Sequence, residues 1–408
     1  MQTDLAEEIK ESEVGKEADA ILRKCVHCGF CTATCPTYQH LGDELDGPRG
    51  RIYLIKQMLE GNEVTAKTQK HLDRCLVCRS CETTCPSGVQ YGKLIEIGRD
   101  YVNKKVDRPF QEQLTRKVLR TIVPYPSRMQ PLLKLGQTVK PLLPATLKAM
   151  LPIQQANNPW PTQNHQRQML VLAGCAQSTI KPGTNEAAAK IFDKLNIKLI
   201  TAPEAGCCGA VSYHMTEHDE GKNFMRRNID AWWPYIEKGC EAILINASGC
   251  GAMVKEYGEI LKKDIEYAAK AEKVSQIAKD PCEILAHENY LSLDIKKNIK
   301  TADQKIAFQT PCSLQHAQGL NGAVEKVLTQ LGFKLSAVAN SHLCCGSAGT
   351  YSIFQKEIAH KLRDNKLDAL MADQPDVIAT ANIGCQLHLE SKASIPVKHW
   401  LEIIAERL

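Results

Sequence analysis

Eight cysteines near the N-terminus form two copies of one pattern, Cys-x2-Cys-x2-Cys-x3-Cys-Pro. The second copy begins fifty residues after the first, and a threonine precedes the last cysteine of each copy. Iron in a cuboidal cluster takes four thiolate ligands, and this run is typical of two-cluster ferredoxins. The spacing therefore predicts two [4Fe-4S] clusters. The cysteines are Cys25, Cys28, Cys31 and Cys35 in the first copy, and Cys75, Cys78, Cys81 and Cys85 in the second.

The fourth cysteine of each copy is expected to ligate the cluster of the other copy, as it does in two-cluster ferredoxins. One cluster would then be held by Cys25, Cys28, Cys31 and Cys85, and the other by Cys75, Cys78, Cys81 and Cys35. This crossing would keep the clusters close enough for electrons to pass between them. Zinc is the alternative metal, but its sites usually come as separated Cys-x2-Cys pairs.

A second repeat places eight more cysteines at the ends of buried-strand patterns. Each half has a single cysteine, then a Cys-Cys-Gly doublet, then another single cysteine; the offset between halves is 137 residues for the first three and 135 for the last. Adjacent cysteines suit a larger cluster or a thiol redox site better than one tetrahedral ion. We expect a further metal site here, with buried structural cysteine as the alternative. The two sets are Cys175, Cys207, Cys208 and Cys250, and Cys312, Cys344, Cys345 and Cys385.

Other side chains could complete or tune these sites. His214, His316 and His388 lie near the loops of the second repeat, but for each we favour a role outside metal binding. Cys240 and Cys282 belong to neither repeat, so we interpret both as ordinary small core residues.

The elements that position these residues change along the chain. Residues 1–24, 51–60 and 64–74 show helical patterns, which makes the first cysteine module mostly helical. Prolines interrupt residues 109–161, so we expect a connector with short amphipathic helices rather than one long helix. In each later half, strands alternate with helices, which predicts parallel sheets covered by helices.

The expected fold class is therefore α+β with several domains. A helical two-cluster ferredoxin-like domain would be followed by a pseudo-symmetric α/β domain of two Cys-Cys-Gly repeats. The expected boundaries are 1–108 for the helical domain, 109–166 for the proline-rich basic connector, 167–300 for the first Cys-Cys-Gly module and 301–408 for the second.

Composition bears on the compartment and the partners. Eighteen cysteines in 408 residues, after a polar start without an apolar segment, indicate metal or redox chemistry in a reducing cytoplasm rather than a secreted disulfide scaffold. The net charge of +5 is mild, and we expect no nucleic-acid partner. Residues 113–185 contain no Asp or Glu but nine Lys or Arg, which favours either an anionic partner or lipid surface, or a solvated linker.

Nearly the whole chain resembles the glycolate oxidase iron–sulfur subunit family. The motifs that carry the resemblance are CVHCGFCTATCPTY, GDELDGPRGRIYLIKQ, HLDRC, CETTCPSG, NIDAWWP, ASGCGA, VKEYG, SHLCCGSAGTYS and ANIGCQ. The resemblance implies a hetero-oligomer in which flavin-binding subunits, carrying FAD that this chain lacks, oxidise glycolate to glyoxylate. This chain would pass the electrons toward a quinone or another acceptor, and it would be cytoplasmic or in contact with the cytoplasmic face of the inner membrane.

A broader group with the same modules includes subunits of lactate utilisation, anaerobic glycerol-3-phosphate dehydrogenase and heterodisulfide reductase. In the last of these, each module ends in Cys-x2-Cys, whereas this chain has Met253 and His388 at the second position. Five-cysteine ligation of an enlarged cluster is therefore not supported. One or two further clusters, each with four cysteines, remain open, as does a vacant site.

Three functions are consistent with these motifs. The chain lacks a G-x-G-x-x-G fingerprint and a Ser-His-Asp signature, which favours an electron-transfer subunit that is not catalytic alone. A thiol reductase acting at the Cys-Cys-Gly domain is the alternative enzyme, and a zinc-stabilised scaffold without redox activity is the third.

Overall fold

The N-terminal region is helical in the computed structural model, which describes residues 1–142, 152, 154–295 and 304–408. The single helix expected over residues 1–24 is two helices, because the Ser12 side chain accepts a hydrogen bond from the Gly15 amide and starts a new one. The helices are α1 (Glu7–Lys10), α2 (Glu13–Lys24), α3 (Pro36–Leu41), α4 (Pro48–Leu59), α5 (Ala66–Asp73), α6 (Ser80–Thr84) and α7 (Tyr91–Lys105), with short 3-10 turns η1 (Phe30–Thr32) and η2 (Glu44–Asp46).

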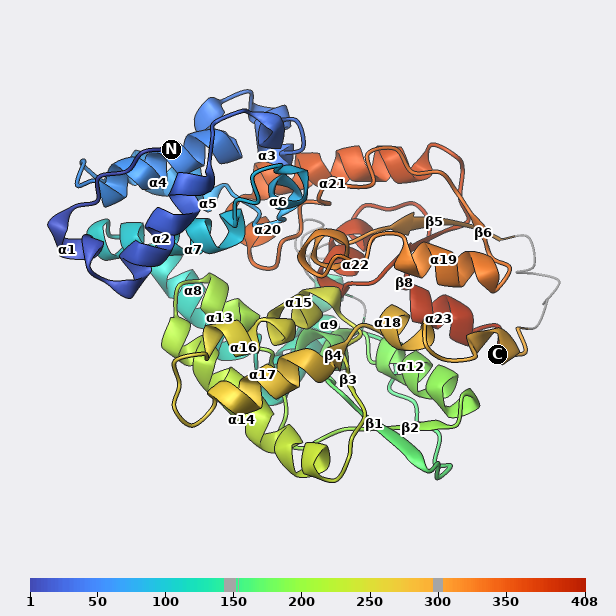
Figure 1. Ribbon diagram of the computed structural model, residues 1–408. Coiled ribbons are helices and arrows are strands. Elements are labelled where there is room, and N and C mark those ends of the chain that lie inside the picture. Colours follow the sequence, from blue (N-terminus) through green and yellow to red (C-terminus); the bar gives the residue numbers. More distant parts are fainter. Residues whose placement is uncertain (143–151, 153, 296–303) are drawn as a thin grey trace.

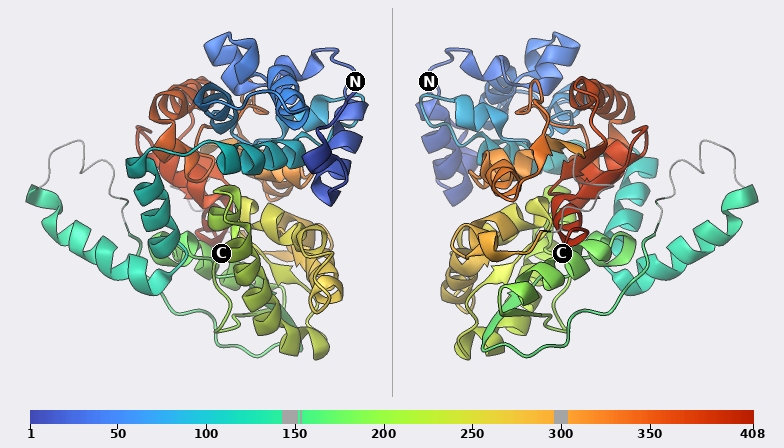
Figure 2. Two further views of the ribbon diagram at one scale, coloured as in Figure 1. Left: turned by 90° about the vertical axis from the view of Figure 1, so that its left-hand side faces the viewer. Right: turned by 90° about the vertical axis from the view of Figure 1, so that its right-hand side faces the viewer.

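The connector contains two helices that meet at a proline pair. Helix α8 (Phe110–Ile122) ends before Pro124, and α9 (Pro126–Val139) begins at Pro126. Prolines separate these helices as expected, but α9 continues through Pro131, which removes only one backbone hydrogen bond from its ladder. A 3-10 turn, η3 (Lys140–Leu142), follows. Figure 2 shows α9 at the edge of the molecule. The segment from Pro144 to Leu151, where another short helix was expected, lies outside the described residues.

Two four-stranded parallel sheets follow, and they share one strand order. The first has the order β2-β1-β3-β4 and the second β6-β5-β7-β8, so each half repeats the other. The fourth strand of each sheet was not predicted, because it is short and carries no cysteine. The strands are β1 (Arg167–Val171), β2 (Ile197–Ile200), β3 (Ile243–Leu244), β4 (Ala278–Lys279), β5 (Lys305–Gln309), β6 (Lys334–Leu335), β7 (Val377–Thr380) and β8 (Val397–His399).

Helices cover both sheets, and the two halves share a core. Phe192 and Leu244 of the first half belong to the same buried cluster as Phe308 and Trp400 of the second, so the halves are fused by apolar burial. The helices of the first half are α11 (Ala176–Ile180), α12 (Gly183–Lys194), α13 (Ala210–His214), α14 (His218–Glu237), α15 (Ser248–Lys255), α16 (Tyr257–Ile260), α17 (Ala268–Ile277) and α18 (Pro281–Leu285).

The second half has a matching set of helices. They are η5 (Ser313–Ala317, one π-helical turn), α19 (Ala323–Gln330), α20 (Tyr351–Phe354), α21 (Lys356–Met371), α22 (Ile383–Glu390) and α23 (Trp400–Ala405), with a 3-10 turn η4 (Tyr290–Ser292) between the halves. In Figure 1 the helical N-terminal domain lies against both halves, with α3, α6 and α20 near one another. Among the described helices, none is long and apolar enough to cross a bilayer.

Candidate iron–sulfur centres

The two N-terminal cysteine loops share an unusual backbone. His27 (φ 55°) and Val77 (φ 50°) occupy equivalent positions in the left-handed region, as do Gly29 (φ 86°) and Arg79 (φ 59°). Such turns point successive amides to one side of the chain, and the Val77 amide donates to Cys75 Sγ over 3.4 Å. A β-branched residue with positive φ is strained. The strain is therefore stored where three cysteines must converge.

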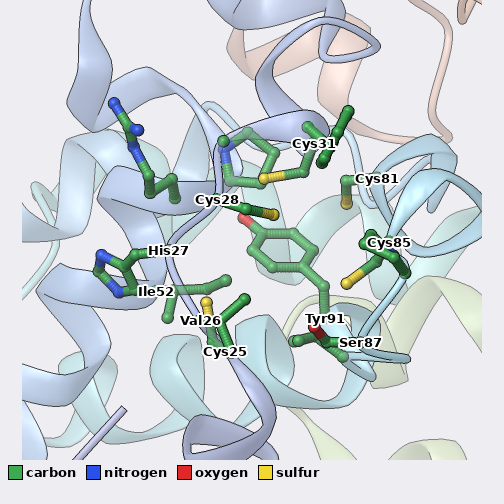
Figure 3. A pocket seen from close by; sticks show the side chains of 16 residues that line it. Cys25, Val26, His27, Cys28, Cys31, Ile52, Cys81, Cys85, Ser87 and Tyr91 are labelled. Atoms are coloured by element: carbon green, nitrogen blue, oxygen red, sulfur yellow. The ribbon is translucent and has the colours of Figure 1, made fainter.

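The first group of sulfurs surrounds one cavity. Cys25, Cys28, Cys31 and Cys85 line it, together with Cys81, Tyr91 and Ile52, and Figure 3 shows these side chains around a common space. Burial, followed by the neighbouring Cys25, raises the pKa of Cys31 to about 11. Four thiols around one space with apolar groups on its wall suit a metal cluster, whose positive charge would offset the thiolates.

Cys28 is exposed at the mouth of this cavity, and it is the only one of the eighteen cysteines that is exposed. Val26 and Phe30 beside it are also largely exposed. One edge of the first group therefore faces the outside of the chain.

The second group of sulfurs is buried. The pKa of Cys81 is raised well above its usual value by burial and then by Cys78, Cys75 and Cys35, which shows that these four thiols face one another. Tyr91 donates its hydroxyl to Cys75 Sγ at 3.6 Å. Cys35, Cys75, Cys78 and Cys81 thus lie near one another, and Cys25, Cys28, Cys31 and Cys85 meet around the first cavity. A cuboidal cluster requires four sulfurs, and the crossed assignment of these cysteines to two clusters stays a prediction.

A buried charge network supports the second group. Asp46 is fully buried and contacts Arg51 at 3.4 Å, Arg74 at 2.7 Å and His71 at 3.1 Å. Thr37 links the network to the cysteines, because its hydroxyl lies 3.2 Å from Cys35 Sγ and 3.2 Å from the Arg51 guanidinium. Sequence reasoning missed Asp46, and its place in the motif GDELDGPRGR was the only signal.

The first Cys-Cys-Gly module gathers Cys175, Cys207, Cys208 and Cys250. The pKa of Cys175 is raised well above its usual value, first by the Cys207 thiol and then by burial, and the pKa of Cys208 is likewise raised, with Cys250 among the causes. Gly209 closes the turn at φ +90°, and its amide donates to Cys207 Sγ over 3.4 Å.

The second module gathers Cys312, Cys344, Cys345 and Cys385 in the same way. Cys312 Sγ lies 3.9 Å from Cys344 Sγ, and the Gly346 amide donates to Cys344 Sγ over 3.4 Å. The pKa of Cys345 is raised well above its usual value, and the Cys385 thiol is among the causes. Each module therefore offers four convergent sulfurs, a donor set that fits an iron–sulfur cluster.

The histidines near these loops have other partners. His214 Nδ1 contacts Glu96 at 3.0 Å, and His388 Nε2 donates to the Ala359 carbonyl at 3.1 Å. His316 contacts the Thr83 hydroxyl at 2.9 Å and the His342 carbonyl at 3.0 Å. Cys282 is buried in the core that the two halves share, and Cys240 packs at the border of a second core.

The second group of N-terminal cysteines lies against the second Cys-Cys-Gly module. Cys78 and Leu76 pack in one apolar cluster with Cys312, Cys344 and Tyr351, and Cys312 contributes to the raised pKa of Cys78. Sequence reasoning could not find this contact, because no pattern links residues more than 230 positions apart. The arrangement brings three groups of sulfurs into succession, from the exposed Cys28 to the interior.

Two family models match the chain. A "4Fe-4S dicluster domain" matches residues 21–89, and a "Cysteine-rich domain" matches twice, at residues 169–255 and 306–390. The matches bear out the fold class: a helical iron–sulfur domain precedes two cysteine-rich α/β repeats.

Several curated proteins are similar to the chain. The "Glycolate oxidase iron-sulfur subunit" of Escherichia coli (strain K12) is 56% identical, with 100% of this chain and 99% of that protein covered. The "Probable glycolate oxidase iron-sulfur subunit" of Bacillus subtilis (strain 168) is 30% identical, with 90% and 88% covered. "Lactate utilization protein A" of Bacillus licheniformis is 22% identical and covers 57% of this chain.

One solved structure shares the fold. A hypothetical protein from Helicobacter pylori superposes with a TM-score of 0.55 at 11% sequence identity, covering 97% of this chain and 72% of that one. At this identity the likeness concerns the fold alone.

Proposed function

Because the chain belongs to the family of glycolate oxidase iron–sulfur subunits, we propose that it is the electron-transfer subunit of a glycolate-oxidising complex. A partner subunit carrying FAD would oxidise glycolate to glyoxylate, and this chain would accept the electrons singly and deliver them to a quinone or another acceptor. The observation that carries the proposal is the convergence of the eight N-terminal cysteines, in a chain 56% identical to a subunit of that name.

The proposed ligands of the two [4Fe-4S] clusters are the two convergent sets. Cys25, Cys28, Cys31 and Cys85 would hold one cluster, and Cys35, Cys75, Cys78 and Cys81 the other. When bound, the clusters supply one-electron carriers whose potential depends on nearby charge and hydrogen bonds. The chain's own residues hold the sulfurs in place, exclude water from the second set and leave the first set open at Cys28.

The Cys-Cys-Gly modules are proposed as further cluster sites, with the stronger case at the second module. Its cysteines Cys312 and Cys344 share an apolar cluster with Cys78, so an electron leaving the second N-terminal set would have a short path into it. The cysteines of the first module lie in apolar clusters in which, among the described residues, no N-terminal cysteine takes part.

The test is anaerobic purification followed by assays of iron, acid-labile sulfide and low-temperature EPR. About eight irons per chain are expected from the two N-terminal clusters, and about twelve or sixteen if one or both modules are filled. Glycolate should then reduce the chain only when the flavin-bearing partner is present. Zinc without sulfide, or glycolate oxidation by the chain alone, would overturn the proposal.

An exposed face on the connector is a proposed contact with the cytoplasmic face of the inner membrane. Phe110, Leu114 and Val118 follow one another at one-turn spacing along α8, and all three are exposed, while Leu135 of α9 is exposed as well. Such a face with basic neighbours binds anionic lipid. Arg116 and Arg120 do not supply the basic charge of this face, because Arg116 pairs with Glu112, and Arg120 with Glu217 and Glu220.

The membrane contact is tested by vesicle flotation. Leu114→Ser combined with Lys117→Glu should reduce co-flotation with vesicles containing phosphatidylglycerol, whereas Tyr53→Ser, an exposed change on α4, should not. Equal flotation of both variants would remove the membrane proposal and leave a partner subunit as the occupant of this face.

A further inference from the structure

The two Cys-Cys-Gly modules differ in one buried charge. Gly209 packs against α14 and Gly346 against α21: a Cβ on Gly209 would meet Gly221 O and Phe224, and one on Gly346 would meet Ala359 O and Leu362. This match fixes the alignment of α14 with α21. It pairs Asn228 of the first module with Lys366 of the second.

These two residues have similar neighbours but different charge. The Asn228 amide donates to Cys207 O at 2.9 Å and accepts from the Gly206 amide at 2.9 Å, and the residue is fully buried. Lys366 is 4% exposed, and its ammonium donates to Asn340 O at 2.9 Å and to Ser341 O at 3.4 Å. Both side chains therefore brace the loop that leads into the Cys-Cys-Gly doublet.

The Lys366 charge is directed at the cysteines. Burial lowers its pKa, whereas Cys345, Cys344, Cys312 and Cys385 each act to raise it, so the ammonium senses all four sulfurs of the module. Within the described part of the chain, no carboxylate forms an ion pair with Lys366. By contrast, the buried Arg51 near the second N-terminal set is paired with Asp46.

The other charged groups near Lys366 do not cancel its field. Lys366 and Cys344 both line a cleft of about 590 Å³ between α3 and α21, whose charged lining also includes Lys361 and Asp368. Asp364, on the same helix, is paired with Arg363 and Lys392. The surroundings of the second module are thus net positive.

The first module has a cation too, but a less buried one. Arg227, next to Asn228, is only half-buried; its guanidinium donates to Cys207 O at 3.4 Å and stacks on the Phe224 ring at 5.0 Å. Solvent screens a charge at such a position more than one that is buried.

We propose that Lys366 raises the reduction potential of the cluster site in the second module, which makes that site the favoured acceptor for electrons from the second N-terminal set. One-electron reduction adds a negative charge to the site and breaks no bond, so an unpaired buried ammonium stabilises the reduced form. The inference rests on the proposed electron-transfer function and adds to it a direction inside the chain: from the exposed Cys28 edge, through the Cys78 set, to the Cys312 set.

The test is a redox titration followed by EPR on the chain with its clusters in place. Lys366→Gln keeps a hydrogen-bond donor for the loop but removes the charge. It should lower the equilibrium constant for electron transfer into the second module roughly tenfold, which corresponds to about 59 mV for one electron. Lys366→Arg should restore most of the potential, because it restores the charge. Circular dichroism and the iron content should stay as in the parent chain.

Arg227→Gln is the control, since it removes one positive charge beside the Cys-Cys-Gly loop of the first module, one residue before the position that matches Lys366. It should leave the potential of the second module unchanged. An unchanged potential in Lys366→Gln, or an equal shift in Arg227→Gln, would overturn the inference. A parent chain with about eight irons would overturn it too, while leaving the proposed function of the N-terminal clusters standing.

Discussion

Asp46 holds three partners in the interior beside the second set of N-terminal cysteines. Arg51 is almost completely buried, so its guanidinium depends on Asp46 for charge compensation. A buried ion pair adds little net stability, but removing one partner leaves an uncompensated charge, which is costly. The residues of this network come from η2, α4 and α5, so the pair fixes how these elements meet.

Asp46→Asn should therefore destabilise the N-terminal domain by about 3–5 kcal/mol and accelerate iron release. The measurement is denaturant unfolding of the anaerobic protein, with iron release followed by a chelator. Asp43→Asn is the control: Asp43 is exposed and accepts only the Leu45 amide, so its loss should cost less than about 1 kcal/mol. Equal effects would show that Asp46 does not carry the network.

At the scale of elements, the hydrophobic period and the spacing of the cysteines predicted most of the helices and strands that position the cysteines. The strands before Cys175, Cys312 and Cys385 formed where apolar runs indicated, because buried parallel strands read as continuous apolar segments. The short β4 and β8 could not be predicted, since two or three residues are too few to show a hydrophobic period. Ser12 is a capping residue that marks the break between α1 and α2, but the apolar spacing across it predicts one continuous helix.

Two glycines in the second module allow the cost of a left-handed backbone to be measured apart from the cost of overpacking. Both have positive φ, but a Cβ on Gly346 would lie 2.5 Å from Ala359 O, whereas one on Gly349 would meet nothing within 4 Å. Gly349→Ala should cost about 1–2 kcal/mol for the left-handed backbone alone. Gly346→Ala should cost roughly 2–5 kcal/mol because overpacking is added. Thermal unfolding of the two variants compares them, and equal costs would exclude a packing role for Gly346.

His399 ties the end of β8 to the first half of the chain. It is fully buried, its Nε2 donates to the Asn246 carbonyl at 3.0 Å, and its Nδ1 accepts from the Leu401 amide at 3.3 Å. Burial lowers the pKa of His399 from 6.5 to about 4. Between these values the unfolded chain binds a proton that the folded chain rejects. Stability from this residue is therefore fully present above pH 6.5 and is lost as the pH falls toward 4.

The expected loss over that window is about 3 kcal/mol. Denaturant unfolding of the parent and His399→Gln, measured from pH 7.5 to pH 5, should show a shallower pH slope in the variant. The exposed His287, changed to Gln, should keep the parent slope. Parallel curves for the parent and His399→Gln would mean that His399 is already protonated in the folded chain.

At the scale of the whole molecule, the N-terminal domain meets the two halves by different means. Arg79–Glu256 and Lys93–Glu259 are ion pairs toward the first half, whereas apolar packing around Tyr351 joins the second. Neither interface could be predicted from the sequence, because cysteine spacing fixes local loops and says nothing of which loop meets which module. The packing decides that the second half, and not the first, borders the Cys78 set.

Tyr351 lies in the apolar contact that would keep the electron path between the Cys78 set and the second module short. Its ring is buried between Leu76 and Cys344 in one cluster, and its hydroxyl donates to the Arg74 carbonyl at 3.1 Å. Tyr351→Ser should cost about 3–5 kcal/mol at this interface by loss of the ring, whereas Tyr351→Phe should cost only about 1 kcal/mol for one hydrogen bond. The measurement is hydrogen exchange of residues 72–82 and 341–352.

Both segments should lose protection together in Tyr351→Ser and keep it in Tyr351→Phe, because each covers the other. Glu256→Gln, which breaks the Arg79 pair toward the first half, should leave both segments protected. If only residues 341–352 lost protection in Tyr351→Ser, the ring would stabilise its own module and not the interface. Joint loss, with slower reduction of the second module in rapid-freeze EPR, would tie the apolar contact to the passage of electrons between the two sets of cysteines.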